Sequence, residues 1–182
     1  MKVQVEFNPK AVNGYRLIGY GNRMLRNEDF NDDQKDAGEI GAGHSVTALY
    51  EIVPAGVDMS ASSVDPLRYQ TPTQTTSAAS SDELLTVKLR YKAPDGDESR
   101  LISTVVTNRP QEVRANLGFA SAVAEVGMLL RASAHAPAAS YESAVARARK
   151  FRQNDPEGTR AEFIKLAELA ASLERLRSDS RR

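Results

Sequence analysis

The spacing of apolar residues changes once along this chain, and that change limits the folds open to it. Before about residue 110, apolar side chains alternate with polar ones, as they do in half-buried strands. After about residue 111, they recur every three or four residues, as they do on helices. Strands followed by helices are typical of an α+β protein. The pattern predicts an antiparallel β-sandwich-like unit of about five strands over 1–110 and a three-helix segment packed on it over 111–182.

Five segments carry the strand pattern: 2–8, 15–20, 45–53, 84–92 and 99–107. The last two flank residues 93–97, Ala-Pro-Asp-Gly-Asp, which favour a turn and so predict a hairpin. Aromatic side chains on the strands are expected to fill the core of this unit: Phe7, Tyr15, Tyr20 and Tyr50. Residues 59–83 are mostly Ser, Thr, Ala, Gln and Pro, and we predict a long flexible loop there.

Three helices are predicted in the second half. The first has its expected core face at Phe119, Val123, Val126 and Leu130. The second covers about 141–152 and follows Ser140 as its N-cap, and the third opens at Asp155-Pro156-Glu157. On the third helix the apolar stripe begins at Phe163 and continues as a leucine stripe: Leu166, Leu169, Leu173 and Leu176. The stripe fits only about two coiled-coil heptads, so packing in the core is the favoured interpretation.

Composition excludes several classes of protein. Lys and Arg together number 24, as do Asp and Glu, and this balance argues against a nucleic-acid-binding protein. Without cysteine there are no disulfides, thiolate zinc sites or iron–sulfur clusters, and there are only two histidines. No apolar run approaches the roughly 20 residues of a membrane span, and no signal peptide is visible. We expect a soluble chain with no cofactor and no direct membrane insertion.

The densest polar cluster, residues 28–39, is the candidate metal site. Three of its side chains alternate as the first ligands of a calcium loop do, and two further acids follow: Asp29, Asn31 and Asp33, then Asp36 and Glu39. The calcium-loop pattern fails at Gln34, where glycine is needed, and at Ile40, where a glutamate is needed. We therefore favour a structural acidic loop, held by Arg16 and Arg23, over a cation site.

His44 follows the glycine-rich residues 38–43 and is the only candidate for acid–base chemistry in this region. It could pair with Glu39 or Asp36, but no nucleophile is identifiable beside them. A bend or bulge explains the glycines more simply. The second histidine, His135, lies in an alanine-rich linker and is expected to be exposed. No catalytic residue is assigned.

Six blocks of sequence are long enough to indicate a family: Val5–Pro9, Tyr15–Arg23, Glu28–Asp33, Asp36–His44, Val46–Pro54 and Phe119–Arg131. Together they resemble the C-terminal region of bacterial von Willebrand factor type A (vWA) domain proteins of the YfbK type. The resemblance covers nearly the whole chain apart from 59–83 and the arginine-rich end. In such proteins this region follows a vWA domain, and the parent proteins look exported and often lipid-anchored.

The resemblance implies a location in the periplasm or cell envelope. It also implies a vWA domain in the same parent chain as partner, with other envelope proteins as further partners. It brings no catalytic residues, so the expected function is a non-catalytic accessory or interaction module. The alternative is a calcium- or magnesium-dependent enzyme, or a metal-binding module, using residues 28–39 and His44. Residues 58–62 spell the vWA metal-binding pattern D-x-S-x-S, but Pro54-Ala55-Gly56 breaks the strand that this pattern needs.

Overall fold

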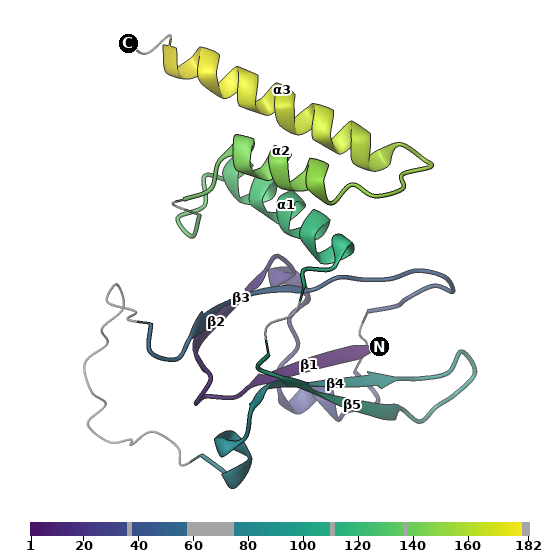
Figure 1. Cartoon of the computed structure of the whole chain (residues 1–182). Coiled ribbons are helices and arrows are strands. Elements are labelled where there is room, and N and C mark those ends of the chain that lie inside the picture. The colour runs from purple at the N-terminus through teal and green to yellow at the C-terminus, as the bar shows by residue number, and fades with distance from the viewer. Residues whose placement is uncertain (36–37, 58–74, 110–111, 137, 180–182) are drawn as a thin grey trace. The chain divides into compact units, whose positions relative to one another are not determined.

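The chain forms two compact units, Met1–Pro110 and Gln111–Arg182, each with its own internal packing. The computed structural model describes residues 1–35, 38–57, 75–109, 112–136 and 138–179. Within these residues, the first unit has five antiparallel strands in two sheets and the second has three α-helices (Figure 1). The predicted α+β class is confirmed.

The larger sheet has three strands in the order β1-β4-β5, all antiparallel. They are β1 (Lys2–Phe7), β4 (Glu83–Tyr91) and β5 (Arg100–Thr107). The predicted hairpin is confirmed as β4–β5. Because side chains alternate across a strand, one face is apolar, with rows such as Val3–Leu89–Ile102 and Phe7–Leu85–Val106. The opposite face is polar on β1 and β4, where it includes the pair Lys2–Arg90, and carries Leu101 and Val105 on β5.

The smaller sheet pairs β2 (Val12–Ile18) with β3 (Leu49–Pro54). β2 ends two residues earlier than predicted, because Gly19 and Tyr20 adopt left-handed backbone angles, with φ of 79° and 56°. β3 begins at Leu49, where its partner strand ends at Ile18, so the predicted start at residue 45 is wrong. A strand is held by hydrogen bonds to a neighbouring strand, and β2 pairs with this segment only from Leu49 onward.

An aromatic cluster joins β1 to the β2–β3 sheet. The ring of Phe7 stacks on Tyr15 at 4.4 Å between centroids and meets the edge of Tyr50 at 5.4 Å. Phe7 is buried and Tyr50 half-buried, as expected for core residues. Tyr15 and Tyr20 are exposed, so their predicted place in the core is wrong. The two sheets thus meet at the Phe7 end of β1, while Val3 at its other end is half exposed.

Part of the predicted loop over 59–83 is folded. Residues 58–74 lie outside the described part of the chain. Residues 77–80 form a short 3-10 helix, η3 (Ser77–Ser80), with Ala79 buried. The side-chain amide of Asn8 donates to the backbone carbonyls of Ala79 and Glu83, at 3.2 and 2.8 Å. The prediction of a flexible loop is therefore wrong for the end that precedes β4.

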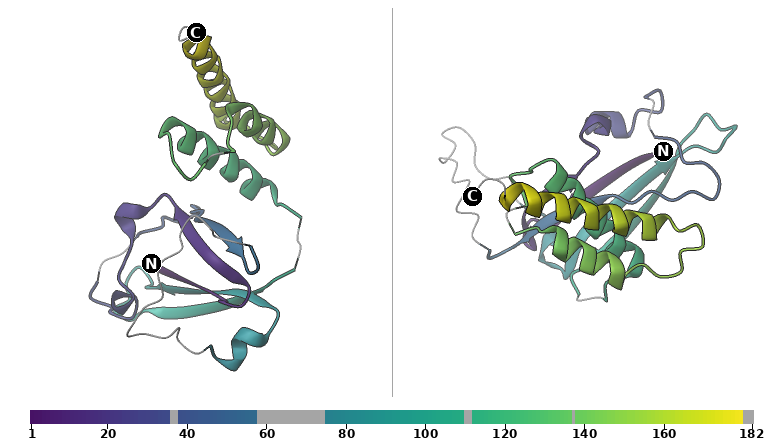
Figure 2. Two further views of the ribbon diagram at one scale, coloured as in Figure 1. Left: turned by 90° about the vertical axis from the view of Figure 1, so that its left-hand side faces the viewer. Right: turned by 90° about the horizontal axis from the view of Figure 1, so that it is seen from above.

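The second unit consists of α1 (Ala115–Leu130), α2 (Tyr141–Lys150) and α3 (Thr159–Asp179). The middle helix, α2, packs against both of the others, and the views of Figure 2 show α3 running alongside it. No helix in the described residues is both long enough and apolar enough to cross a membrane.

Two of the predicted helix starts can be compared directly with the structure. The hydroxyl oxygen of Ser140 accepts from the backbone N–H of Ser143 at 3.1 Å, which confirms the predicted N-cap of α2. The third helix begins at Thr159, later than predicted, after Gly158 with φ of 73°. Even so, the carboxylate of Asp155 accepts from the backbone N–H groups of Arg160 and Ala161, at 3.2 and 2.8 Å. Asp155 therefore satisfies the first turn of α3 from outside the helix.

The core of the helical unit is built mainly from small side chains. Its buried members are Ala122, Val126, Tyr141, Ala144, Val145, Ala148, Ile164, Ala167 and Ala171. Alanines allow helix axes to approach closely, so the helices meet along their alanine faces. Several larger side chains of α1 and α3 are left outside: Val123 and Leu130 are exposed, as is the entire leucine stripe. The predicted core faces are therefore wrong at these positions and right at Val126 and at the half-buried Phe119 and Phe163, which pack against each other.

Candidate functional site

The acidic segment lies against the polar face of the three-stranded sheet. It includes the 3-10 turn η2 (Glu28–Phe30), whose Phe30 is buried with the guanidinium of Arg90 5.6 Å from its ring centre. The ammonium of Lys2, itself buried, donates to the backbone carbonyls of Asp29 and Asp32. These contacts attach the segment to β1 and β4.

Two side chains that were candidate ligands are used as hydrogen-bond acceptors. The side-chain oxygen of Asn31 accepts from Arg90 at 3.1 Å, and the carboxylate of Asp33 accepts from the backbone N–H of Ser99 at 3.0 Å. Hydrogen bonds from Ser99, first from its side chain and then from its backbone, hold the pKa of Asp33 below its ordinary value, and the charges of Lys92 and Arg90 act in the same direction. Asp33 therefore anchors the segment to the start of β5.

One of the predicted arginine partners of this segment also pairs elsewhere. Arg16 forms an ion pair with Glu51 on the neighbouring strand, at 2.5 Å, and its contact with the acidic segment stays a prediction. The side chain of Arg23 and all of Asp36 lie outside the described residues. Among the described residues, the cations seen to hold the segment include the N-terminal ammonium of Met1, which donates to the carbonyl of Gly38, and Lys2, Arg90 and Lys92.

The remaining candidates, Glu39 and His44, lie on an exposed stretch of the same segment. Within the described residues no hydrogen bond joins them, and the imidazole of His44 lies over Gly41, where an added Cβ would be 3.0 Å from Nδ1. In that same set of residues, no three His, Cys, Asp or Glu side chains are grouped so as to hold a metal ion. The cation-dependent alternative stays a prediction.

An open hollow of about 1010 Å³ lies between β1, β2 and the segment that connects β2 to β3. Large apolar side chains line it although they remain exposed, from 39% for Ile40 to 71% for Met24. The others that matter are Val3, Tyr15, Leu25 and Val46. A contiguous apolar surface of this kind marks a binding site more often than a solvated face.

The charged side chains that line the hollow are mainly basic. Among the described lining residues they are Lys2, Arg16 and Arg26, against the single acid Glu39. Lys2 and Arg16 already bind groups of the protein itself, the carbonyls of Asp29 and Asp32 and the carboxylate of Glu51, so the exposed apolar side chains are what the hollow offers to a partner.

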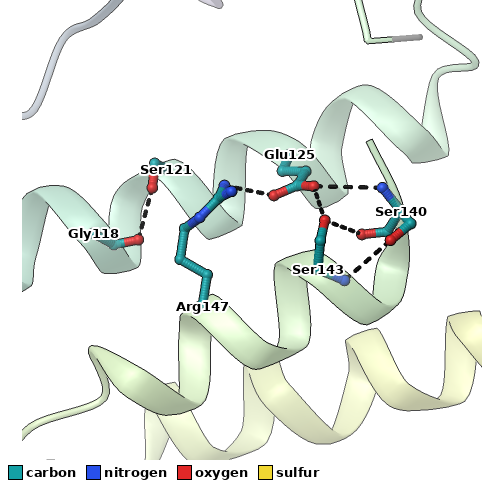
Figure 3. A network of polar contacts seen from close by, with 6 residues as sticks. All are labelled: Gly118, Ser121, Glu125, Ser140, Ser143 and Arg147. Carbon is teal, nitrogen blue, oxygen red and sulfur yellow. Dashed lines mark hydrogen bonds and ion pairs between the residues drawn. The ribbon is translucent and has the colours of Figure 1, made fainter. Parts of the chain in front are cut away.

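A second polar cluster lies inside the helical unit (Figure 3). The carboxylate of Glu125 on α1 is almost fully buried, and it accepts from Arg147 at 2.6 Å, from the hydroxyl of Ser143 and from the backbone N–H of Ser140 at 3.4 Å. Every partner comes from α2 or its N-cap. Because the carboxylate is satisfied by the protein itself, the cluster fastens α1 to the start of α2 and leaves no open position for a ligand.

The residues that line these sites were not predicted from the sequence. Met24, Leu25 and Ile40 lie outside the strands, so the alternation of apolar and polar residues that marks a strand does not reveal them. The sequence signal that could have identified them is the presence of large apolar residues within a polar segment that connects two strands. Glu125 was visible as the only charge in an apolar helix, a pattern that indicates a buried and paired carboxylate.

Comparison with known proteins gives one family and one related chain. The family described as "Uncharacterized protein YfbK, C-terminal" matches residues 1–173, which include both sheets, α1, α2 and most of α3. The chain is 40% identical over 173 residues to "Uncharacterized protein YfbK" of Escherichia coli (strain K12), an alignment that covers 93% of this chain and 29% of that protein. The chain thus spans less than a third of the length of its relative. No solved structure matches it. The resemblance read from the six sequence blocks is confirmed, and the chain belongs to the family of YfbK C-terminal domains.

Proposed function

We propose that this chain is a non-catalytic interaction module that works beside a vWA domain of the same parent protein. The observation that carries the proposal is the open hollow of the first unit, which is lined by large apolar side chains as exposed as that of Met24. Surfaces that a monomer leaves apolar and unfilled are typical of protein–protein contacts, and methionine suits an adaptable contact.

The match covers only 29% of the related protein, which supports a partner domain elsewhere in the same parent chain. The family resemblance supports a vWA domain there and an extracytoplasmic, lipid-anchored parent. The reading frame upstream of this segment tests that context. A D-x-S-x-S pattern at the end of a hydrophobic strand is expected, and its absence would contradict the proposal.

Binding is tested by titrating the whole chain with the vWA domain encoded in that reading frame, followed by calorimetry. We expect Met24→Ser to weaken binding by about fivefold or more, as for an interface residue that contributes measurably. Leu101→Ser on β5 is the matched control, because Leu101 is also exposed but does not line the hollow. Equal effects of the two substitutions, or no binding at about 1 mM, would overturn the proposal.

The cation-dependent alternative is separated by a calcium or magnesium titration followed by thermal unfolding. A cation bound to the folded chain raises the melting temperature as its concentration increases. We expect no rise, because Asn31 and Asp33 accept hydrogen bonds from Arg90 and Ser99. A rise that Asp33→Asn abolishes would favour the metal-binding module instead.

A further inference from the structure

The leucine stripe of α3, Leu166, Leu169, Leu173 and Leu176, is an exposed apolar surface that the helical core does not use. Its four side chains are 56–66% exposed. The residues that pack α3 against the rest of the unit are Ile164, Ala167 and Ala171. At about 100° per residue, the centres of these two sets lie about 170° apart around the helix. The stripe therefore points away from the helical core.

The spacing of the leucines is that of a coiled-coil seam. Steps of three, four and three residues place them at successive a and d positions of two heptads. A narrow a/d stripe is the form that pairs with one other helix, whereas the wider apolar face of a core helix spreads over neighbouring positions. The geometry therefore favours one partner helix laid along α3.

The charges along the seam favour a second copy of the same helix in antiparallel orientation. Glu162 lies in line with the leucines near the N-terminal end, and Arg177 borders them near the C-terminal end. In a parallel pair Glu162 would face its own copy. In an antiparallel pair, aligned so that Leu169 faces Leu173, Glu162 of one helix lies about one helical turn from Arg177 of the other, and the helix dipoles also oppose.

We infer that two copies of this chain associate through antiparallel pairing of their α3 helices along the leucine stripe. The seam is short, so the dimer belongs to the small and weak class of interfaces. This self-association is separate from the hollow of the first unit and does not depend on the proposed vWA partner.

The first test is sedimentation equilibrium of the full chain from about 10 μM to about 1 mM, the range in which small interfaces associate. We expect a reversible monomer–dimer equilibrium that Leu169→Ser with Leu173→Ser removes. The matched control is Leu117→Ser with Leu130→Ser, which changes two exposed leucines of α1 and should leave the equilibrium unchanged. Circular dichroism checks that both variants keep their helices.

A second test reports the orientation of the pair. Because the chain has no cysteine, single thiols can be introduced without background. Leu169→Cys and Leu173→Cys, one of them tagged to change its mass, should form a mixed disulfide dimer on gentle oxidation when combined, and little dimer when each is alone. Disulfides require Cα atoms within about 7 Å, so random encounters are disfavoured.

Three results would overturn the inference. A chain that stays monomeric at 1 mM would leave the seam to a helix of another protein. Efficient self-crosslinking of each single variant would indicate parallel pairing. An effect of the α1 control equal to that of the α3 variant would place the interface elsewhere.

Discussion

At the scale of single residues, a comparison of Glu125 with Glu168 distinguishes a buried structural carboxylate from a carboxylate at the surface. Both pair with an arginine of α2, but the Glu125 side chain is 9% exposed and that of Glu168 39%. We expect Glu125→Ala to lower the free energy of unfolding by about 1.5–3 kcal/mol, because a buried charged hydrogen-bond network is lost. The control Glu168→Ala should cost about 0–1 kcal/mol. Urea unfolding followed by helical circular dichroism measures both, and equal costs would contradict the structural role of Glu125.

Asp155 connects the start of α3 to pH. Burial raises its pKa, but the backbone N–H groups of Ala161 and Arg160, with the charges of Arg152 and Arg160, outweigh burial and leave the pKa below its ordinary value of 3.8. The stabilisation is therefore complete above the unfolded pKa and is lost as pH falls through the folded one.

The corresponding measurement is the urea midpoint of the helical unit between about pH 5 and about pH 2, a range that spans the ordinary pKa of aspartate. We expect the midpoint to fall less steeply on acidification in Asp155→Asn than in the unchanged chain. Asp95→Asn, an exposed turn residue of the first unit, is the control. Identical slopes for Asp155→Asn and the unchanged chain would show that the carboxylate does not stabilise α3.

At the scale of elements, truncating a side chain is expected to cost much more stability on one face of α3 than on the other. Ile164 is buried, so Ile164→Ala should cost about 2–5 kcal/mol. Leu169 is exposed, so Leu169→Ala should cost less than about 0.5 kcal/mol in dilute solution. Thermal unfolding at low protein concentration tests the pair. A cost for Leu169→Ala near that for Ile164→Ala would return the leucine stripe to the core.

The two glycines of α1 form another matched pair. A Cβ added at Gly118 would lie 2.4 Å from the ring of Phe151, whereas one added at Gly127 meets nothing within 4 Å. We expect Gly118→Ala to destabilise the helical unit by about 1–3 kcal/mol through overpacking. Gly127→Ala should stabilise it by about 0.5–1 kcal/mol, because alanine favours helix over glycine. Stabilisation by both, measured in urea, would show that Phe151 moves aside freely.

At the scale of the whole molecule, two replacements within the segment between β3 and β4 test how much of that segment the fold requires. Replacing 59–74 with a short Gly/Ser linker should leave the melting temperature within a few degrees, because the sequence there offers few large apolar side chains to bury. Extending the replacement through residue 82 removes buried Ala79 and its contact with Asn8, and should lower the melting temperature clearly. Calorimetry distinguishes the two. Loss of cooperative unfolding in the shorter replacement would show that the segment packs.

Features that depend on neighbouring residues were predictable from the sequence alone. The order of strands and helices follows from apolar period, the β4–β5 hairpin from its turn residues, and the start of α2 from Ser140. The six family blocks are likewise a property of the chain as written, and so was the polar character of residues 28–39. Each of these signals lies within a few residues of what it specifies.

Tertiary structure alone decided which surfaces are used. Helices α1 and α3 are apolar on two sides, and close packing with the alanines of α2 selected the smaller side chains for burial and left the leucines exposed. The length of β3 was set by where β2 ends, and the partners of the acidic segment by β1 and β4, which are distant in sequence. The hollow exists because the two sheets meet at Phe7 and leave apolar side chains exposed around the rest of β1. Such choices depend on the distances between segments that only folding brings together, so no local pattern could encode them.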